Sequence, residues 1–274
     1  MKKHYLSLGF VLIVIALLLT ACSSKDKSAN TFSVGLECNY APFNWTQTDD
    51  SNGAVAINGG GYCGGYDVEI AKGIAKDLGK DLVIVKTEWD GLIPALNAGK
   101  IDAVIAGMSP TEERKASVDF SDPYYESDLV IVVKADGAYA DASSLADFSG
   151  ARITGQLNTF HDSVVDQIPE VDHVAAMESF PAMIVALSSD KIDGYVSERP
   201  GAVSAIESNP DLAFVDFDGE NGFEASPEDV AVAVAVKKGN TDLAKINESL
   251  AAVTKDKRLE MMDTAIANQP VSQD

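Results

Sequence analysis

A stretch of sequence that occurs twice constrains this chain more than any other feature. Residues 89–107 (WDGLIPALNAGKIDAVIAG) align without gaps with residues 180–198 (FPAMIVALSSDKIDGYVSE), and an Ala-Leu pair and a Lys-Ile-Asp triplet recur at matching places. Each copy is a segment with helical spacing followed by a short apolar run, which is typical of a helix leading into a buried strand. The period is too long for a solenoid. We therefore expect two similar α/β lobes, with chance similarity between two common units as the alternative.

Further apolar runs alternate with helical patterns in the first half of the chain. Asp67 is predicted to cap a helix that ends at Gly79, because apolar residues recur at helical spacing between them. The other predicted elements are strands at 32–36, 81–86 and 101–106 and a helix at 91–98. Strands and helices in this order are typical of a parallel sheet covered by helices.

Two apolar runs mark where the chain is expected to pass between the lobes. Residues 129–134 (LVIVVK) and 230–236 (VAVAVAV) flank a middle block, and we interpret them as a pair of hinge strands. The tail from Thr241 onward has helical spacing and is expected to return to the first lobe. The predicted division is 31–128 plus 231–274 for one lobe and 129–230 for the other.

The amino-terminal segment predicts export. Lys2 and Lys3 precede an almost wholly apolar run at 6–19, and small residues follow it up to Cys22. Because this run is shorter than the roughly 20 residues that span a membrane, residues 1–21 are predicted to be a secretory signal peptide.

The end of this segment, Leu-Thr-Ala-Cys22, resembles the lipobox of bacterial lipoproteins. The resemblance implies that Cys22 becomes the mature amino terminus and carries lipid, palmitate included. Residues 22–30 would then be a polar, lipidated tether on the extracytoplasmic face of the bacterial cell membrane. An ordinary signal peptide in which Cys22 is incidental is the alternative.

Charge and cysteine content narrow the possible partners. A net charge of −21 disfavours nucleic acid and anionic lipid headgroups as partners. Cys38 and Cys63 remain besides Cys22. A disulfide between them is permitted in an exported protein, and two buried free thiols are the alternative that the sequence leaves open.

The repeat also predicts where a ligand binds. Gly107 and Glu198 come at equivalent positions, just after the two repeated strands. Ligands of open parallel sheets bind beyond the carboxyl ends of the strands, so we expect both positions to line one cleft between the lobes. Ser109 and Glu112 have the spacing of a capping box, which predicts a helix amino terminus at this cleft. Arg114 adds a guanidinium that suits a carboxylate.

Four motifs together resemble the polar amino-acid-binding proteins of the bacterial solute-binding proteins, family 3. The motifs are Tyr40-Ala-Pro-Phe43, Gly65-Tyr-Asp-Val68, Ala106-Gly-Met-Ser-Pro-Thr-Glu-Glu-Arg114 and Phe120-Ser-Asp-Pro-Tyr-Tyr125. The resemblance covers nearly all of residues 31–265. It implies an α/β, two-lobe, type II periplasmic-binding-protein-like fold with the ligand in the interlobe cleft. It also implies a monomer that has no cofactor or metal and works with the permease of an ABC transporter.

The resemblance also implies roles for individual residues. Arg114, helped by Ser109, is expected to bind the α-carboxylate of a free amino acid. Gly107 and Glu198 are expected to bind its α-ammonium group, although the family usually has Asp where this chain has Glu198. The residues implied in the rest of the site are Tyr40 and Trp89 as aromatic walls and Asn158 or Thr159 as the carboxylate-binding turn of the second lobe.

Specificity is expected to depend on Glu37, which ends the first predicted strand. With Tyr40 and Trp89 it suits a cationic side chain, so arginine, lysine or ornithine is favoured and glutamine comes next. Residues 49–65 are predicted to be a long loop that either shapes entry to the cleft or is passive.

An enzyme on the same fold is the alternative function. The candidate is a cyclohexadienyl-dehydratase-like elimination that uses Glu198 and Glu37 as acid and base. His161 and His173 lie in no metal-ligand pair or nucleophile motif, and a surface position on a helix is expected for His161. A sensor domain is disfavoured because no spanning segment follows the binding region. We therefore expect a binding protein and not an enzyme.

Overall fold

The computed structural model describes residues 30–270. The predicted signal peptide, Cys22 and almost all of the predicted tether lie outside this range. Within it, no helix is both long enough and apolar enough to cross a membrane.

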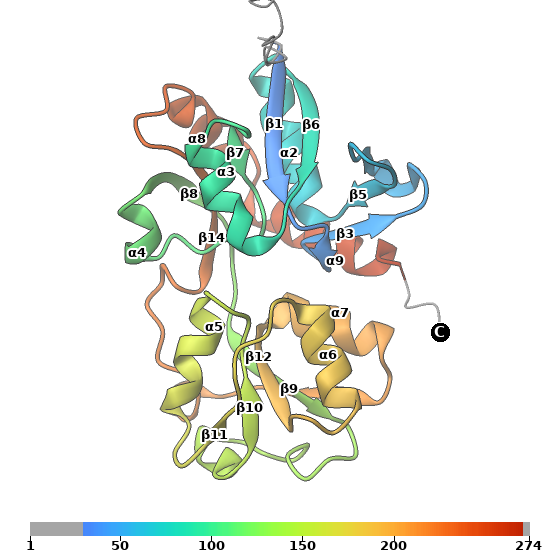
Figure 1. Ribbon diagram of the computed structural model, residues 1–274, viewed down its shortest axis with the longest axis vertical. Helices are drawn as coiled ribbons and strands as arrows, with labels where there is room; N and C mark the ends of the chain where they lie inside the picture. Colours follow the sequence, from blue (N-terminus) through green and yellow to red (C-terminus); the bar gives the residue numbers. More distant parts are fainter. Residues whose placement is uncertain (1–29, 271–274) are drawn as a thin grey trace, which may run out of the picture. The chain divides into compact units, whose positions relative to one another are not determined.

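The first five-stranded sheet has the order β6-β1-β7-β14-β8 (Figure 1). Its strands are β1 (Thr31–Leu36), β6 (Asp81–Lys86), β7 (Ala103–Val104), β8 (Val118–Glu126) and β14 (Ala231–Lys237). β1 and β7 are parallel, whereas β14 is antiparallel to both β7 and β8. The sheet is therefore mixed, and the prediction of a parallel sheet holds only for part of it.

The second five-stranded sheet has the order β11-β10-β12-β9-β13. Its strands are β9 (Leu129–Lys134), β10 (Arg152–Thr154), β11 (Asp172–His173), β12 (Gly194–Glu198) and β13 (Leu212–Val215). β10 is parallel to β11 and β12, and β9 is antiparallel to β12 and β13. The repeated strands β7 and β12 both stand third in their sheets, beside an antiparallel strand. We call the parts of the chain built on the first and second sheets lobe 1 and lobe 2.

The chain passes between the two five-stranded sheets twice, between β8 and β9 and between β13 and β14. The two crossing segments touch, because the Ser127 amide donates to the Val230 carbonyl oxygen at 3.1 Å. β9 and β14 themselves each lie inside one sheet and pair along their lengths. The chain therefore crosses between these sheets in the segments that come directly before the two predicted hinge strands, at 127–128 and 216–230.

The helices are shorter than their patterns predict in several places. The α-helices are α2 (Tyr66–Asp77), α3 (Leu92–Asn97), α4 (Glu112–Lys115), α5 (Phe160–Ser163), α6 (Phe180–Ser188), α7 (Arg199–Ser208), α8 (Leu243–Ala251) and α9 (Lys255–Asn268). The 3₁₀ helices are η1 (Ser51–Gly53), η2 (Trp89–Gly91), η3 (Leu145–Phe148), η4 (Val164–Gln167) and η5 (Gly219–Asn221). α8 and α9 pack on α2 in lobe 1, and α9 also contacts α7 in lobe 2.

Asp67 does not cap α2, which corrects the prediction. Gly65 is the N-cap, with φ +121° and no room for a Cβ, which would lie 2.4 Å from the Phe43 carbonyl oxygen. Asp67 is the second residue of the helix and is fully buried. Its carboxylate accepts hydrogen bonds from Asn44 at 2.8 Å and from the Tyr124 hydroxyl at 2.6 Å. The Asp67 carboxylate therefore forms buried hydrogen bonds inside lobe 1 and does not cap the helix.

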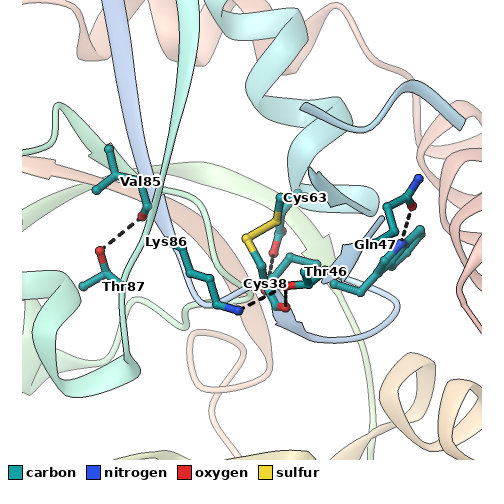
Figure 2. Close-up of a disulfide and its surroundings, with 10 residues drawn as sticks. Cys38, Thr46, Gln47, Cys63, Val85, Lys86 and Thr87 are labelled. Atoms are coloured by element: carbon teal, nitrogen blue, oxygen red, sulfur yellow. Dashed lines mark hydrogen bonds between the residues drawn. A yellow bond between two sulfur atoms is a disulfide. The ribbon is translucent and has the colours of Figure 1, made fainter. Parts of the chain in front are cut away.

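Residues 49–65 contain two strands of a small third sheet and the 3₁₀ helix η1, so they are not a plain loop. The order of this sheet is β2-β3-β5-β4, with β2 (Asn39–Tyr40), β3 (Asn44–Gln47), β4 (Val55–Ala56) and β5 (Tyr62–Gly64). Cys38 and Cys63 are joined by a disulfide across this sheet, with Cα atoms 5.7 Å apart (Figure 2). The Thr46 hydroxyl also donates to the Cys38 carbonyl oxygen at 2.8 Å. The turn after β1 is thus fixed both covalently and by hydrogen bonds.

Candidate functional site

Residues from both lobes enclose a cavity of about 10 Å³. Its lining comprises Tyr40, Trp89, Gly107, Ser109 and Arg114 from lobe 1 and Gln156, Thr159, Phe160 and His161 from lobe 2. Six of the nine predicted ligand-binding residues are in this set. The volume is about what one water molecule requires, so an amino acid can enter only if the walls move apart.

A larger cavity of about 420 Å³ adjoins the small one and shares four of its lining residues, Trp89, Arg114, Thr159 and Phe160. Asn158, a predicted site residue, lines this larger cavity. Three acidic residues also line it, namely Asp90, Glu113 and Asp229. Arg114 is the one basic residue among them. The wider part of the cleft therefore has an acidic wall.

Arg114 lies at the end of the short helix α4 and between the lobes. The predicted capping box of Ser109 and Glu112 is wrong, because Thr111 is the N-cap and accepts from the Arg114 amide at 3.4 Å. The Arg114 guanidinium donates to the Ser109 carbonyl at 2.9 Å and lies 5.0 Å from the centroid of the Trp89 ring. Burial lowers its pKa to about 10, so the group stays charged at neutral pH.

Asn158 connects lobe 2 to lobe 1 through three contacts. Its main-chain carbonyl oxygen accepts a hydrogen bond from the Arg114 guanidinium at 3.0 Å and one from the Trp89 indole at 3.5 Å. Its side-chain amide donates to Asp90 at 2.8 Å. Asn158 has φ +57°, a left-handed conformation that asparagine tolerates better than most residues. The turn therefore places a carbonyl oxygen on the guanidinium that is predicted to bind a carboxylate.

Glu198 ends β12, is 4% exposed, and is held by two partners. His161 Nε2 lies 3.0 Å from Glu198 Oε2, and the Tyr40 hydroxyl donates to the same oxygen. Burial favours the neutral acid, but the electrostatic interaction with His161 and the two hydrogen bonds outweigh it and keep the pKa of Glu198 below its usual value. His161 is 8% exposed, so the expectation of a surface histidine is wrong.

Glu37 directly follows β1, is 3% exposed and lines neither of these two cavities, but its hydrogen-bond partner Gln156 lines the small one. Burial raises its pKa to about 7, a hydrogen bond with Gln156 opposes this rise, and the negative charges of Glu88 and Asp90 add to it. Glu37 therefore bonds to lobe 2 through a neutral amide and lies beside two further acids.

Gly107 packs directly against Tyr40. It has φ +61°, and a Cβ there would lie 3.0 Å from the Tyr40 ring, so both conformation and space favour glycine. The Gly107 amide donates to the Tyr124 hydroxyl at 3.2 Å, and Tyr124 donates in turn to Asp67. Tyr40 itself stacks on Phe180 of lobe 2, with ring centroids 4.1 Å apart. The Tyr40 ring is thus an aromatic wall of the site, and Phe180 of lobe 2 packs against one face of it.

The residues that sequence reasoning missed are His161, Gln156, Asp67 and Tyr124. Asp67 and Tyr124 stand inside motifs that the sequence analysis quoted, but their contacts join positions 57 residues apart. His161 is two residues after Thr159, yet nothing in a four-residue helix indicates which side chains face the interior. His173, by contrast, bonds to Asp162 and Asp166 at 2.9 and 2.8 Å and is absent from the lining of both cavities.

The chain is similar to known proteins along most of its length. A model of the bacterial extracellular solute-binding proteins, family 3, matches residues 32–265. A probable histidine-binding protein of Campylobacter jejuni is 32% identical over 233 residues, which cover 81% of this chain and 84% of the relative.

Two solved structures show the same fold. An amino acid ABC transporter substrate-binding protein from Streptococcus pneumoniae, bound to L-arginine, has a TM-score of 0.75 and 26% identity over 87% of this chain and 94% of that one. An ancestral arginine-binding protein bound to glutamine has a TM-score of 0.69 and 33% identity over 89% and 100% of the two chains. The predicted α/β fold of the periplasmic-binding-protein type is confirmed.

Proposed function

Because the chain belongs to the bacterial extracellular solute-binding proteins, family 3, we propose that it binds a free L-amino acid between its lobes and delivers it to an ABC transporter. The observation that carries this proposal is the pair of opposite charges in one cleft. Arg114 of lobe 1 lines the small cavity, and Glu198 of lobe 2 contacts two residues that line it, His161 and Tyr40.

A zwitterion is the ligand that this pair fits. A buried ion without a partner costs several kcal/mol or more, so a closed cleft must compensate both ligand charges. The α-carboxylate would replace the Asn158 carbonyl oxygen on Arg114, and the α-ammonium would lie by Glu198 and the Gly107 carbonyl. Because each lobe supplies one of these charges, ligand favours closure of the lobes. Ser109, Thr159 and the rings of Tyr40 and Trp89 complete the proposed site.

We propose arginine, lysine or ornithine as the ligand, with glutamine next. Three acids line the larger cavity, and Glu37 stands among further negative charge, so a cationic side chain gains favourable electrostatics there. The Streptococcus pneumoniae relative is bound to L-arginine, which agrees with this class. The ancestral relative bound to glutamine supports the second choice, since an amide can also bond to a carboxyl group.

A thermal-shift screen of the purified protein against the twenty amino acids and ornithine tests the proposal. A ligand at one hundred times Kd stabilises the folded state by about 2.7 kcal/mol, which is readily measured. The expected result is a large shift with a basic amino acid and a small one with most others. If no amino acid shifts the transition, the proposal is wrong, and elimination activity that uses Glu37 and Glu198 becomes the function to assay.

The mode of membrane attachment is a separate part of the proposal. We propose that Cys22 carries the lipid anchor and that the mature protein is a monomer outside the cytoplasm, tethered by residues 22–30. Metabolic labelling with palmitate in cells distinguishes this from an ordinary signal peptide. Wild type should incorporate label and Cys22→Ala should not, whereas label in the variant would contradict the assignment.

A further inference from the structure

His161 is the one residue around the small cavity that brings both a titratable ring and an unused polar atom. The residue is 8% exposed, and its Nε2 contacts Glu198 at 3.0 Å. Its other ring nitrogen, Nδ1, is buried and has no hydrogen-bond partner within residues 30–270. Leaving a polar atom buried without a partner costs about 1–3 kcal/mol, so this arrangement points to a group that is supplied from outside the protein.

The backbone holds this histidine in place. Gly155 follows β10, and a Cβ on it would lie 2.4 Å from the Asp162 amide nitrogen and 2.5 Å from the His161 carbonyl carbon. α5 therefore packs directly on the end of β10, which is possible only because residue 155 has no side chain. The His161 ring makes a T-shaped contact with the ring of Phe180, with centroids 5.7 Å apart. The backbone of α5 and this aromatic contact together position the ring.

We propose that His161 is a further ligand-binding residue and that its Nδ1 accepts a hydrogen bond from the α-amino group of the bound amino acid. The inference rests on the proposed function and adds a contact to it. An ionised Glu198 can only accept, so Nε2 carries the hydrogen of the His161–Glu198 contact. In the neutral ring Nδ1 then has a free lone pair, which suits an N–H donor.

Electrostatic attraction decides which group of the ligand lies beside His161. The α-carboxylate is attracted to Arg114 on the lobe 1 side of the cavity, and the α-ammonium to Glu198. His161 Nδ1 belongs to the ring that contacts Glu198, so it is the acceptor that the ammonium group meets there. The Tyr40 hydroxyl donates to the same Glu198 oxygen.

Two substitutions separate a direct role of Nδ1 from a supporting role of Nε2. His161→Gln keeps an amide near the position of Nε2 and removes the polar atom at Nδ1. His161→Asn does the reverse. Titration calorimetry with L-arginine, or L-glutamine if arginine causes no thermal shift, should show Kd about 10- to 100-fold weaker for His161→Gln, and a smaller loss for His161→Asn. The opposite order would mean that His161 acts only by holding Glu198, which overturns the inference.

A spectroscopic measurement tests the same contact without a change in sequence. In protein labelled with ¹⁵N-histidine, the His161 Nδ1 resonance should move on saturation with ligand while Nε2 remains protonated. An unchanged Nδ1 resonance, or an Nδ1 that carries a proton in the complex, overturns the acceptor role. If wild type binds no amino acid at all, the proposed function fails and this inference fails with it. If wild type binds and only these His161 results are negative, the proposed function stands alone.

Discussion

Glu37 and Glu198 are two glutamates at the same depth, 3% and 4% exposed, and each contacts a residue that lines the small cavity, yet the fold shifts their pKa values in opposite directions. Glu198 has a histidine and a tyrosine hydroxyl on one oxygen, and its pKa is lowered. Glu37 has an amide partner and two acidic neighbours, and burial raises its pKa to about 7.

The comparison shows that burial alone does not decide what a carboxylate contributes. Glu198 is compensated within the protein, so it is charged and positioned before a ligand arrives. Glu37 lacks a cation among its described partners and gains one only from the ligand. Glu198 therefore suits a group that every amino acid has, and Glu37 suits a group that distinguishes one amino acid from another.

The largest expected effect comes from removing the positive charge of Arg114, against which both glutamate variants can be compared. Arg114→Ala should weaken binding of arginine and glutamine alike, by about 2–5 kcal/mol, because both present the same α-carboxylate. Titration calorimetry measures this. Arg152→Ala is the matched control, since that guanidinium pairs with Asp193 in lobe 2 and should leave affinity almost unchanged. An Arg114 variant that altered preference but kept the best affinity would contradict the role.

The second prediction concerns stability, where the two glutamates act with opposite sign. The pKa of Glu37 is raised from 4.5 to about 7 on folding, so its ionisation destabilises the fold as pH rises through this window. Glu37→Gln should therefore increase the free energy of unfolding at pH 8 by up to about 3 kcal/mol and change it little near pH 4.5. Urea unfolding at both pH values measures the difference. Because the pKa of Glu198 is lowered, the stability it contributes is lost as pH falls below its usual value, and Glu198→Gln should instead destabilise the protein at pH 8.

The third prediction compares the same two variants as binders. Glu37→Gln should weaken arginine binding about 10- to 100-fold and leave glutamine within about threefold, since an amide still bonds a neutral side chain. Glu198→Gln should weaken both ligands by similar factors. Glu88→Gln, an exposed neighbour of Glu37, controls for a general change of charge. Equal losses in the Glu37 and Glu198 variants would remove the distinction between the two residues.

The smallest expected effect is the pH dependence of the wild type. A cationic ligand binds the ionised form of Glu37, which makes up about a tenth of the population at pH 6 and about nine-tenths at pH 8 when the pKa is about 7. Arginine affinity should therefore rise about tenfold between these pH values, and the dependence should be weaker in Glu37→Gln. A wild-type profile that is flat for arginine would show that Glu37 does not meet a cation.

Much of the fold followed from sequence because its cause is local and periodic. The repeat predicted that β7 and β12 take corresponding places, and apolar runs predicted β6 and β9 at their observed limits. The caps did not follow. Ser109 and Thr111 both have side chains that can cap a helix, and the sequence does not choose between them, whereas Gly65 takes the N-cap in place of Asp67 because residue 65 packs against the backbone of Phe43. His161 was misplaced because its partner Glu198 is 37 residues away and belongs to another element.

The disulfide has a consequence for where the protein can work. Cys38 stands between Glu37 and Tyr40, so the crosslink to Cys63 fixes the backbone that carries both side chains. Closing a segment of 25 residues stabilises a fold by about 3 kcal/mol, and reduction removes that contribution. Cytosolic thiol buffers keep such bonds open, whereas the cell exterior allows them to form. A copy of the protein in a reducing compartment would therefore lack this crosslink and would hold the backbone of Glu37 and Tyr40 less firmly.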